Sequence, residues 1–385
     1  MGQNNVDCRE NTLIARGSGI FDGTGSINAP VYRSATYVHP TLEHDKNFYY
    51  YSRCDTPTRR ALEKQVAALE HGEDAVAVSS GLAAMDVVIR LFSPGDRIIV
   101  SSDLYGGSYR LFNEFYKKYG LIFDYVDTWN AEALKKAVRP ETKGFFIETP
   151  SNPMLRVTDI ALVSKIAKKN DALVIVDNTF LSPLFQKPID LGADIVIHSA
   201  TKFLAGHNDV LAGIIVTTSD KMREKLNYYS YCVGNPLSAD DAWLTIRGIE
   251  TLSVRLERQQ KNARILAEYL EAVSEIKKVI YPGNKSHPDH ELAKRQQYGF
   301  GSMLSFEVWD ADKAPTIFER FKIVYQAGSL GGVQSLICIP NTSLQCPIPK
   351  ELREQTGVSD SLFRLSVGIE DVEDLIEDIS QAIRI

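Results

Sequence analysis

Long hydrophobic runs and paired cysteines are both missing from this chain. No apolar segment approaches the roughly 20 residues that a membrane-spanning helix needs, and the polar residues 1–6 form no hydrophobic signal segment. The five cysteines are scattered, odd in number and without C-x-x-C spacing. We therefore expect a cytoplasmic protein with reduced thiols that does not associate with a membrane.

Several ligand-binding patterns are also missing. The sequence contains neither the G-x-G-x-x-G loop of dinucleotide-binding proteins nor a P-loop, which disfavours a dehydrogenase. Its formal net charge of −6 gives no support for nucleic-acid binding. His287 and His290 flank Pro288, with no cysteine or further histidine at metal-ligand spacing, so we expect no metal site.

What the chain does have is a series of short apolar runs between residues 59 and 217. After a helix expected over 59–70, the runs are 75–78, 98–100, 122–126, 144–147, 173–176, 195–197 and 213–216. They are rich in valine and isoleucine and lack strict alternation, which is typical of strands covered by helices on both faces. The pattern predicts an α/β fold with a mostly parallel, seven-stranded sheet.

The pattern changes after about residue 238. A long charged helix is expected over 239–270, then strands over 303–307 and 363–367 and a closing helix over 371–383. Residues 1–46 show few periodic signals and indicate an extended arm with short helical pieces. We predict an N-terminal arm (1–46), a large α/β domain (47–237) and a smaller C-terminal α+β domain (238–385).

A lysine follows one of the predicted buried strands, in the segment H-S-A-T-K-F (198–203). A partly desolvated Lys202 would lose its proton readily and attack a carbonyl, as a Schiff base to pyridoxal phosphate (PLP) requires. Ser199 and Thr201 offer hydroxyl donors to a phosphate, and Asp177 offers an anion to a protonated pyridine nitrogen. The segment alone is equally compatible with an ordinary strand end and an exposed lysine.

Two segments offer candidate phosphate contacts. Gly81 and Leu82 follow a strand and open a helix, where backbone N–H groups and the helix dipole face an anion. Tyr51 and Arg53 combine a phenol with a guanidinium, which pairs well with phosphate. Taken alone, the first segment is more often a structural turn and the second an aromatic surface turn.

Three residues are candidates for ring and substrate contacts. Tyr105, at a strand end beside two glycines, has a ring that can stack on a flat heteroaromatic group. Arg364 lies inside an apolar strand and needs an anionic partner, for which a substrate carboxylate is suitable. Ser329 can donate to the same carboxylate. A core tyrosine and an internal ion pair are the structural alternatives.

Taken together, these segments resemble the Cys/Met-metabolism family of PLP-dependent enzymes, the trans-sulfuration group, from about residue 28 to the C-terminus. The shared motifs are Y-S-R (51–53), S-G-L-A-A (80–84), D-L-Y-G-G-S-Y-R-L-F (103–112), E-T-P-S-N-P (148–153), V-D-N-T-F (176–180), S-A-T-K (199–202), G-H-N-D-V (206–210), S-L-G-G (329–332) and R-L-S-V-G (364–368). So many motifs in the same order are not a coincidence.

The resemblance implies an aspartate-aminotransferase-like fold (PLP fold type I), PLP as cofactor and amino acids as substrates. It implies that Lys202 binds PLP covalently and moves protons, that Asp177 pairs with the pyridine nitrogen, and that Tyr105 stacks on the ring. The remaining implied contacts are Gly81, Leu82, Ser199 and Thr201 to the phosphate, Asn152 to the phenolic oxygen, and Ser329 and Arg364 to the substrate carboxylate. Tyr51 and Arg53 would reach the phosphate of a neighbouring subunit, which implies a homotetramer built of active dimers.

The implied reaction is first that of a cystathionine γ-synthase, in which cysteine displaces the acyl group of an O-acylated homoserine. A cystathionine γ- or β-lyase is the alternative, and a methionine γ-lyase or a non-catalytic PLP-binding protein is less favoured. The segments L-R-V (155–157) and G-H-N-D-V-L-A-G (206–213) are most similar to bacterial γ-synthases. Methionine γ-lyases typically have a cysteine where this chain has Gly107.

Three departures from the family pattern are expected near the substrate entrance. D-T-P-T (55–58) replaces the usual G-N-P-T, and S-L-Q-C (343–346) replaces M-T-H-A. Gly328 replaces a glutamate that γ-lyases and γ-synthases often carry. We therefore expect Asp55, Gly328 and Gln345 to bear on substrate choice and not on the PLP chemistry.

Overall fold

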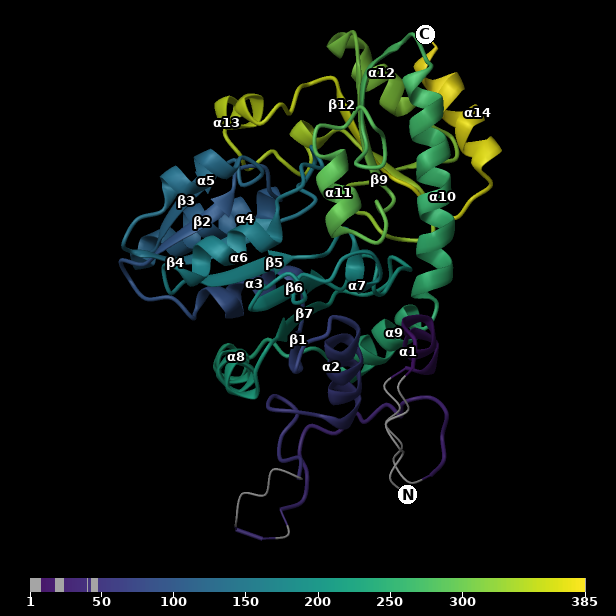
Figure 1. Ribbon diagram of the computed structural model, residues 1–385. Helices are drawn as coiled ribbons and strands as arrows, with labels where there is room; N and C mark the ends of the chain where they lie inside the picture. Colours follow the sequence, from purple (N-terminus) through teal and green to yellow (C-terminus); the bar gives the residue numbers. More distant parts are fainter. Residues whose placement is uncertain (1–7, 18–23, 40, 43–47, 385) are drawn as a thin grey trace.

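The computed structural model of the protein describes residues 8–17, 24–39, 41–42 and 48–384 (Figure 1). Of the predicted N-terminal arm, residues 1–7, 18–23, 40 and 43–46 lie outside the described part. The described part of the arm contains helix α1 (Glu10–Arg16). It otherwise has no strand and a single bridge, from Thr36 to Tyr51, in agreement with an extended segment.

A seven-stranded sheet forms the larger half of the molecule. In spatial order its strands are β1 (Asp74–Val78), β7 (Gly213–Thr217), β6 (Ile195–Ser199), β5 (Leu173–Asp177), β4 (Thr142–Glu148), β2 (Arg97–Ser101) and β3 (Ile122–Val126). Only β7 runs antiparallel to its neighbours, and the pairs from β6 to β3 are parallel. The predicted mostly parallel, seven-stranded sheet is confirmed.

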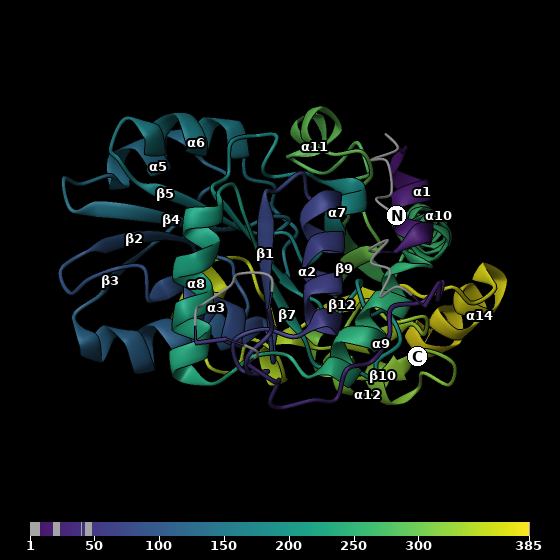
Figure 2. The ribbon, with the colours of Figure 1, turned by 90° about the horizontal axis from the view of Figure 1, so that it is seen from below.

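Helices cover both faces of this sheet. They are α2 (Pro57–Leu69), α3 (Gly81–Ile89), α4 (Gly106–Arg110), α5 (Ala131–Ala137), α6 (Ile160–Lys168), α7 (Ser182–Phe185), α8 (Asp220–Val233) and α9 (Ala239–Ile249). Figure 2 shows α2 and α8 on opposite sides of β1. Ile99 packs into one core cluster while its neighbours Ile98 and Val100 pack into another. Burial on both faces explains why these strands read as continuous apolar runs.

A five-stranded sheet forms the smaller half. Its order is β10 (Tyr325–Gln326), β11 (Leu336–Cys338), β12 (Leu362–Ser366), β9 (Met303–Val308) and β8 (Ile276–Ile280). Its helices are α10 (Leu252–Glu271), α11 (His290–Gln296), α12 (Ala314–Glu319), α13 (Lys350–Gln355) and α14 (Val372–Ile383). Phe363 and Leu365 face the core with α10 and α14, so the alternating residue Arg364 points the other way, toward the larger half.

The predicted single helix over 239–270 is wrong, because the chain forms two helices there. α9 ends at Ile249 and α10 begins at Leu252. The Gly248 carbonyl accepts hydrogen bonds from the Thr251 hydroxyl at 3.2 Å and from Arg255 Nη2 at 2.7 Å. These side-chain donors replace the next turn of backbone bonding and end α9. The domain limits at 46/47 and 237/238 stay a prediction.

Candidate active site

A cavity lies at the carboxyl ends of the parallel strands, beside the face of the smaller sheet that carries Arg364. It encloses about 880 Å³, its open mouth included. The predicted site residues that line it are Gly81, Leu82, Tyr105, Asn152, Asp177, Ser199, Thr201, Lys202 and Arg364. Ser329 bonds to Lys202 and, with Lys202 and Thr201, lines an adjoining cavity, whereas Tyr51 and Arg53 line neither.

Lys202 stands in the turn after β6, where its amide donates to the Ser199 carbonyl at 3.1 Å. Its Nζ donates to Ser329 Oγ at 2.8 Å, and no described carboxylate forms an ion pair with it. Burial, with a smaller effect of the Arg364 charge, lowers the pKa of the Lys202 amine to about 8. At pH 7 about a tenth of such an amine is neutral, far more than for an exposed lysine. This lysine is suited to attack a carbonyl.

Asp177 ends β5 with its carboxylate buried against the cavity. Its Oδ1 accepts hydrogen bonds from the Thr179 amide at 3.0 Å and the Thr179 hydroxyl at 2.5 Å. Burial raises the pKa of Asp177 above its usual range, although the two bonds from Thr179 oppose this. A cation facing Asp177 would favour the ionised form, and a protonated pyridine nitrogen is such a cation.

Polar donors gather where α3 begins. Ser80 caps this helix by accepting from the Ala83 amide at 3.1 Å, which leaves the Ser80 proton free to donate. Gly81 and Leu82 occupy the first turn, where backbone N–H groups have no partner within the helix. Ser199 lies beside them on the cavity wall, while the Thr201 hydroxyl donates to the Ala212 carbonyl at 3.2 Å. Such a donor set is suited to a phosphate.

Tyr105 lies at the start of α4 with its amide donating to Glu148 Oε2 at 3.0 Å. Its ring lies over Gly107, where a Cβ atom would overlap the ring. Any side chain at position 107, including the cysteine typical of methionine γ-lyases, therefore requires Tyr105 to move. Burial and the nearby Asp177 charge raise the pKa of Glu148 well above its usual value.

Arg364 is buried, with 1% of its surface exposed, yet it forms no ion pair among the described residues. Its Nη1 donates to Asn152 Oδ1 at 3.1 Å and its Nη2 donates to the Ser329 carbonyl at 2.9 Å. Its Nε has no hydrogen-bond partner there. The structural alternative of an internal ion pair is therefore not what the described residues show, and the guanidinium is available to a carboxylate from the cavity.

Tyr51 and Arg53 form a separate cluster with Tyr231 of α8. The Arg53 guanidinium lies 5.2 Å from the centre of the Tyr51 ring and 4.7 Å from that of Tyr231. It also donates to the Tyr231 hydroxyl at 3.4 Å. The structure thus does not bring these two predicted phosphate contacts to the cavity of their own chain.

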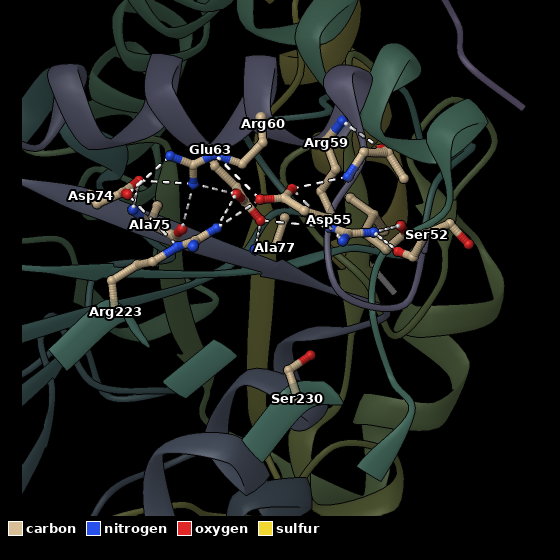
Figure 3. A network of polar contacts seen from close by, with 12 residues as sticks. Ser52, Asp55, Arg59, Arg60, Glu63, Asp74, Ala75, Ala77, Arg223 and Ser230 are labelled. Carbon is tan, nitrogen blue, oxygen red and sulfur yellow. Dashed lines mark hydrogen bonds and ion pairs between the residues drawn. The ribbon is translucent and has the colours of Figure 1, made fainter. Parts of the chain in front are cut away.

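Of the three departures from the family pattern, Gly328 and the segment 343–346, through Leu344, line the cavity. The expectation that Asp55 stands at the entrance is wrong for this chain's own cavity. Figure 3 shows Asp55 in an ionic network, 3.1 Å from Arg223 Nη2, 3.7 Å from Arg60 Nε and 3.9 Å from Arg59 Nη2. Burial and the neighbouring Glu63 raise the pKa of Asp55 to about 6, against the effect of the three arginines. Arg59 and Arg60 follow Asp55 within five residues, but Arg223 is 168 residues away, so the motif alone could not show this network.

Sequence reasoning assigned no supporting role to several residues that help to build the site. Thr179 holds Asp177, and Glu148 holds the Tyr105 backbone. Leu344 lines the cavity, and the adjacent Gln345 is buried behind it. The strand-end position of Glu148 and the nearness of Thr179 to Asp177 were usable signals. The departure S-L-Q-C (343–346) from the family pattern marked the segment that contains Leu344 and Gln345, but not the contacts that these residues make.

In the described ranges, 8–17, 24–39, 41–42 and 48–384, no group of three or more histidine, cysteine or acidic residues is arranged to hold a metal ion. Within the same ranges, every helix is too short or too polar to cross a bilayer.

The donor set fits PLP. A buried amine of lowered pKa, an acid that lacks its cation, and the hydroxyl and amide donors at the start of α3 match its aldehyde, pyridine nitrogen and phosphate. Together with the fold, these groups define a PLP-dependent enzyme.

The comparisons with known proteins identify the family. Residues 11–384 match the family model of the Cys/Met metabolism PLP-dependent enzymes, and the chain belongs to this family. It is 48% identical over 360 residues to the cystathionine β-lyase of Lactococcus lactis subsp. cremoris (strain MG1363), covering 94% of each chain. It is 45% identical to the cystathionine γ-lyase of Bacillus subtilis (strain 168), covering 97% of this chain and 99% of the relative.

A solved structure shows the same fold. The cystathionine γ-synthase of Xanthomonas oryzae pv. oryzae, in complex with cystathionine, superposes with a TM-score of 0.95 at 40% identity. The match covers 98% of both chains. The predicted fold class, PLP cofactor and trans-sulfuration family are therefore confirmed. The relatives carry three different activities, so family membership leaves the exact reaction open.

Proposed function

We propose that the protein is a cystathionine γ-synthase, which joins cysteine to an O-acylated homoserine by γ-replacement. The observation that carries PLP chemistry at this site is the Lys202 amine, which has a lowered pKa, is held by Ser329 and lines the same cavity as Asp177 and Arg364. Likeness to a γ-synthase that holds cystathionine supports the proposal.

In this proposal Arg364, held by Asn152, binds the substrate, and Lys202 transfers protons. Arg364 binds the substrate carboxylate through its free Nε and one Nη, with Asn152 fixing the guanidinium. PLP, once bound, supplies an electron sink for the bond-breaking steps. Lys202 Nζ takes the proton from the substrate Cα and returns a proton at a neighbouring carbon, for which a pKa of about 8 is well matched. Tyr105 stacks on the ring and assists the departing group.

A carbon–sulfur lyase is the second candidate, and of the two lyases Gly328 favours the cystathionine β-lyase. Position 328 lines the cavity but carries no carboxylate, unlike many γ-lyases and γ-synthases. The similarity of L-R-V (155–157) to γ-synthases does not bear on substrate choice, because Arg156 lies away from the cavity. It forms an ion pair with Asp289 at 2.6 Å and stacks on Trp129.

A product assay distinguishes these reactions. Pure enzyme is incubated with O-acetyl- or O-succinylhomoserine plus cysteine, and separately with cystathionine. We expect cystathionine and the free carboxylic acid from the first mixture. Pyruvate with homocysteine from cystathionine would indicate β-elimination, and 2-oxobutyrate with cysteine would indicate γ-elimination. Failure to form cystathionine from every homoserine ester would contradict the γ-synthase proposal.

We further propose that the site is completed by a neighbouring subunit in a homotetramer of active dimers. The placement of Tyr51 and Arg53 outside their own cavity, on the exposed cluster with Tyr231, supports this. The guanidinium faces no described acidic side chain and is suited to an anion from another chain. The five cysteines are all free thiols, which agrees with a cytoplasmic location.

Mixing two inactive variants tests this sharing. Lys202→Ala disables the site of its own subunit. If Arg53 acts across the interface, Arg53→Ala instead disables the site of the neighbouring subunit. After the variants are unfolded together and refolded, half of the dimers are hybrids with one intact site, so about a quarter of wild-type activity is expected. Each variant refolded alone is the control. Mixtures no more active than the controls would contradict shared sites.

A further inference from the structure

A buried amide joins the smaller half of the molecule to two turns of the active site. Gln345, in the segment between β11 and β12, is 1% exposed. Its Nε2 donates to the Leu104 carbonyl at 2.9 Å and to the Asn152 carbonyl at 2.7 Å. These partners are 241 and 193 residues away in sequence. Both protons of the amide are therefore used to hold two separate strand ends together.

Each of these carbonyls belongs to a residue that lines the cavity or directly precedes one. Leu104 directly precedes Tyr105, whose ring forms part of the cavity wall. Asn152 also accepts a hydrogen bond from Arg364 Nη1 through its own side chain. Among the described residues, Gln345 is the donor recorded for both backbone oxygens. The amide thus fixes the distance between the ring-stacking and carboxylate-binding parts of the site.

The segment around Gln345 is itself seated closely on the site. The Leu344 carbonyl lies against Gly106, where a Cβ atom would overlap it, and the Leu344 side chain lines the cavity. The backbone N–H of Gln345 donates to the Pro340 carbonyl at 2.8 Å, and Arg353 Nη1 donates to the Asn341 carbonyl at 2.7 Å. The segment therefore presents the Gln345 side chain from a fixed backbone.

We propose that Gln345 is a positioning residue, which sets Tyr105 and Asn152 relative to Arg364 and so determines how tightly and in what orientation the substrate carboxylate binds. The proposal rests on the proposed roles of Tyr105 and Arg364 but not on which carbon–sulfur reaction follows. Without the two donors, the buried carbonyls lose their partners and the turns can separate. PLP itself would remain bound, because Asp177 and the start of α3 do not touch Gln345.

Glycine binding to the PLP-loaded enzyme tests the proposal, since glycine has the carboxylate but no leaving group. Gln345→Met keeps the size of the side chain and removes both donors. We expect its Kd for glycine, measured by the change in PLP absorbance, to rise about 10- to 100-fold with unchanged PLP content. Gln345→His keeps a ring N–H, as in the family's usual M-T-H-A, and should stay within about threefold of wild type.

Ser343→Ala is the matched control. It removes a side-chain donor from the same segment, where Ser343 Oγ bonds to the Ile339 carbonyl at 2.9 Å, and it touches neither turn. Glycine binding to this variant should equal that of wild type. Unchanged binding in Gln345→Met would overturn the proposal. So would equal weakening in all three variants, in proportion to a lowered Tm. A protein that binds glycine as expected but forms no cystathionine would contradict the γ-synthase assignment alone.

Discussion

Replacing Lys202 by alanine is expected to lower kcat by about 10³-fold or more on whichever amino-acid substrate the enzyme turns over. The change removes the one amine that the cavity presents beside Ser329 and Asp177. No other lysine lines this cavity, so no described amine can take over the proton transfer. Steady-state turnover of the purified variant, saturated with PLP, measures the effect.

The control is Lys169→Ala, which removes an exposed lysine at the end of α6. It should leave kcat unchanged. A Lys202→Ala variant that retains more than a tenth of wild-type kcat would show that the proton transfers occur elsewhere. Far-ultraviolet circular dichroism of both variants separates this outcome from a failure to fold.

Replacing Arg364 by lysine is expected to lower kcat/KM by about 10²- to 10⁴-fold, mainly through a higher KM. Lysine keeps the charge but has a single nitrogen, which cannot reproduce the planar fork by which three guanidinium nitrogens reach separate partners. Arg364 bonds to Asn152 and to the Ser329 carbonyl at 3.1 and 2.9 Å, and its free Nε is available to a carboxylate. Steady-state kinetics with saturating and limiting amino acid give the two constants.

Arg320→Lys is the matched control, because Arg320 also bonds to a backbone carbonyl, that of Gln381, but lies away from the cavity. Its KM should equal that of wild type. An unchanged KM in Arg364→Lys would mean that another group binds the substrate carboxylate.

The site was easiest to predict where a charged residue lies inside an apolar strand or directly after one. A lysine and an acid directly after buried strands, and an arginine inside one, stand out because burying a charge is costly without a purpose. The structure brings Lys202, Asp177 and Arg364 to one cavity. The seven-stranded sheet was readable for a related reason, since strands buried on both faces leave continuous apolar runs.

What could not be predicted depends on contacts between distant segments. Gln345 was expected near the substrate entrance, but the sequence could not show that it bonds to the carbonyls of Leu104 and Asn152. Asp55 was expected at the substrate entrance, but Arg223, 168 residues away, helps to draw it into an ionic network. The very short strands β10 and β11 were also missed, because two or three residues carry no periodic signal.

The most direct test of the account is to locate the residue that binds PLP. The enzyme is reduced with borohydride, digested, and its peptides are sequenced by mass spectrometry. The account predicts a phosphopyridoxyl group on Lys202 and on no other lysine. A label on another lysine, or none on Lys202 in enzyme that turns over its substrate, would contradict the assignment of this cavity as the active site.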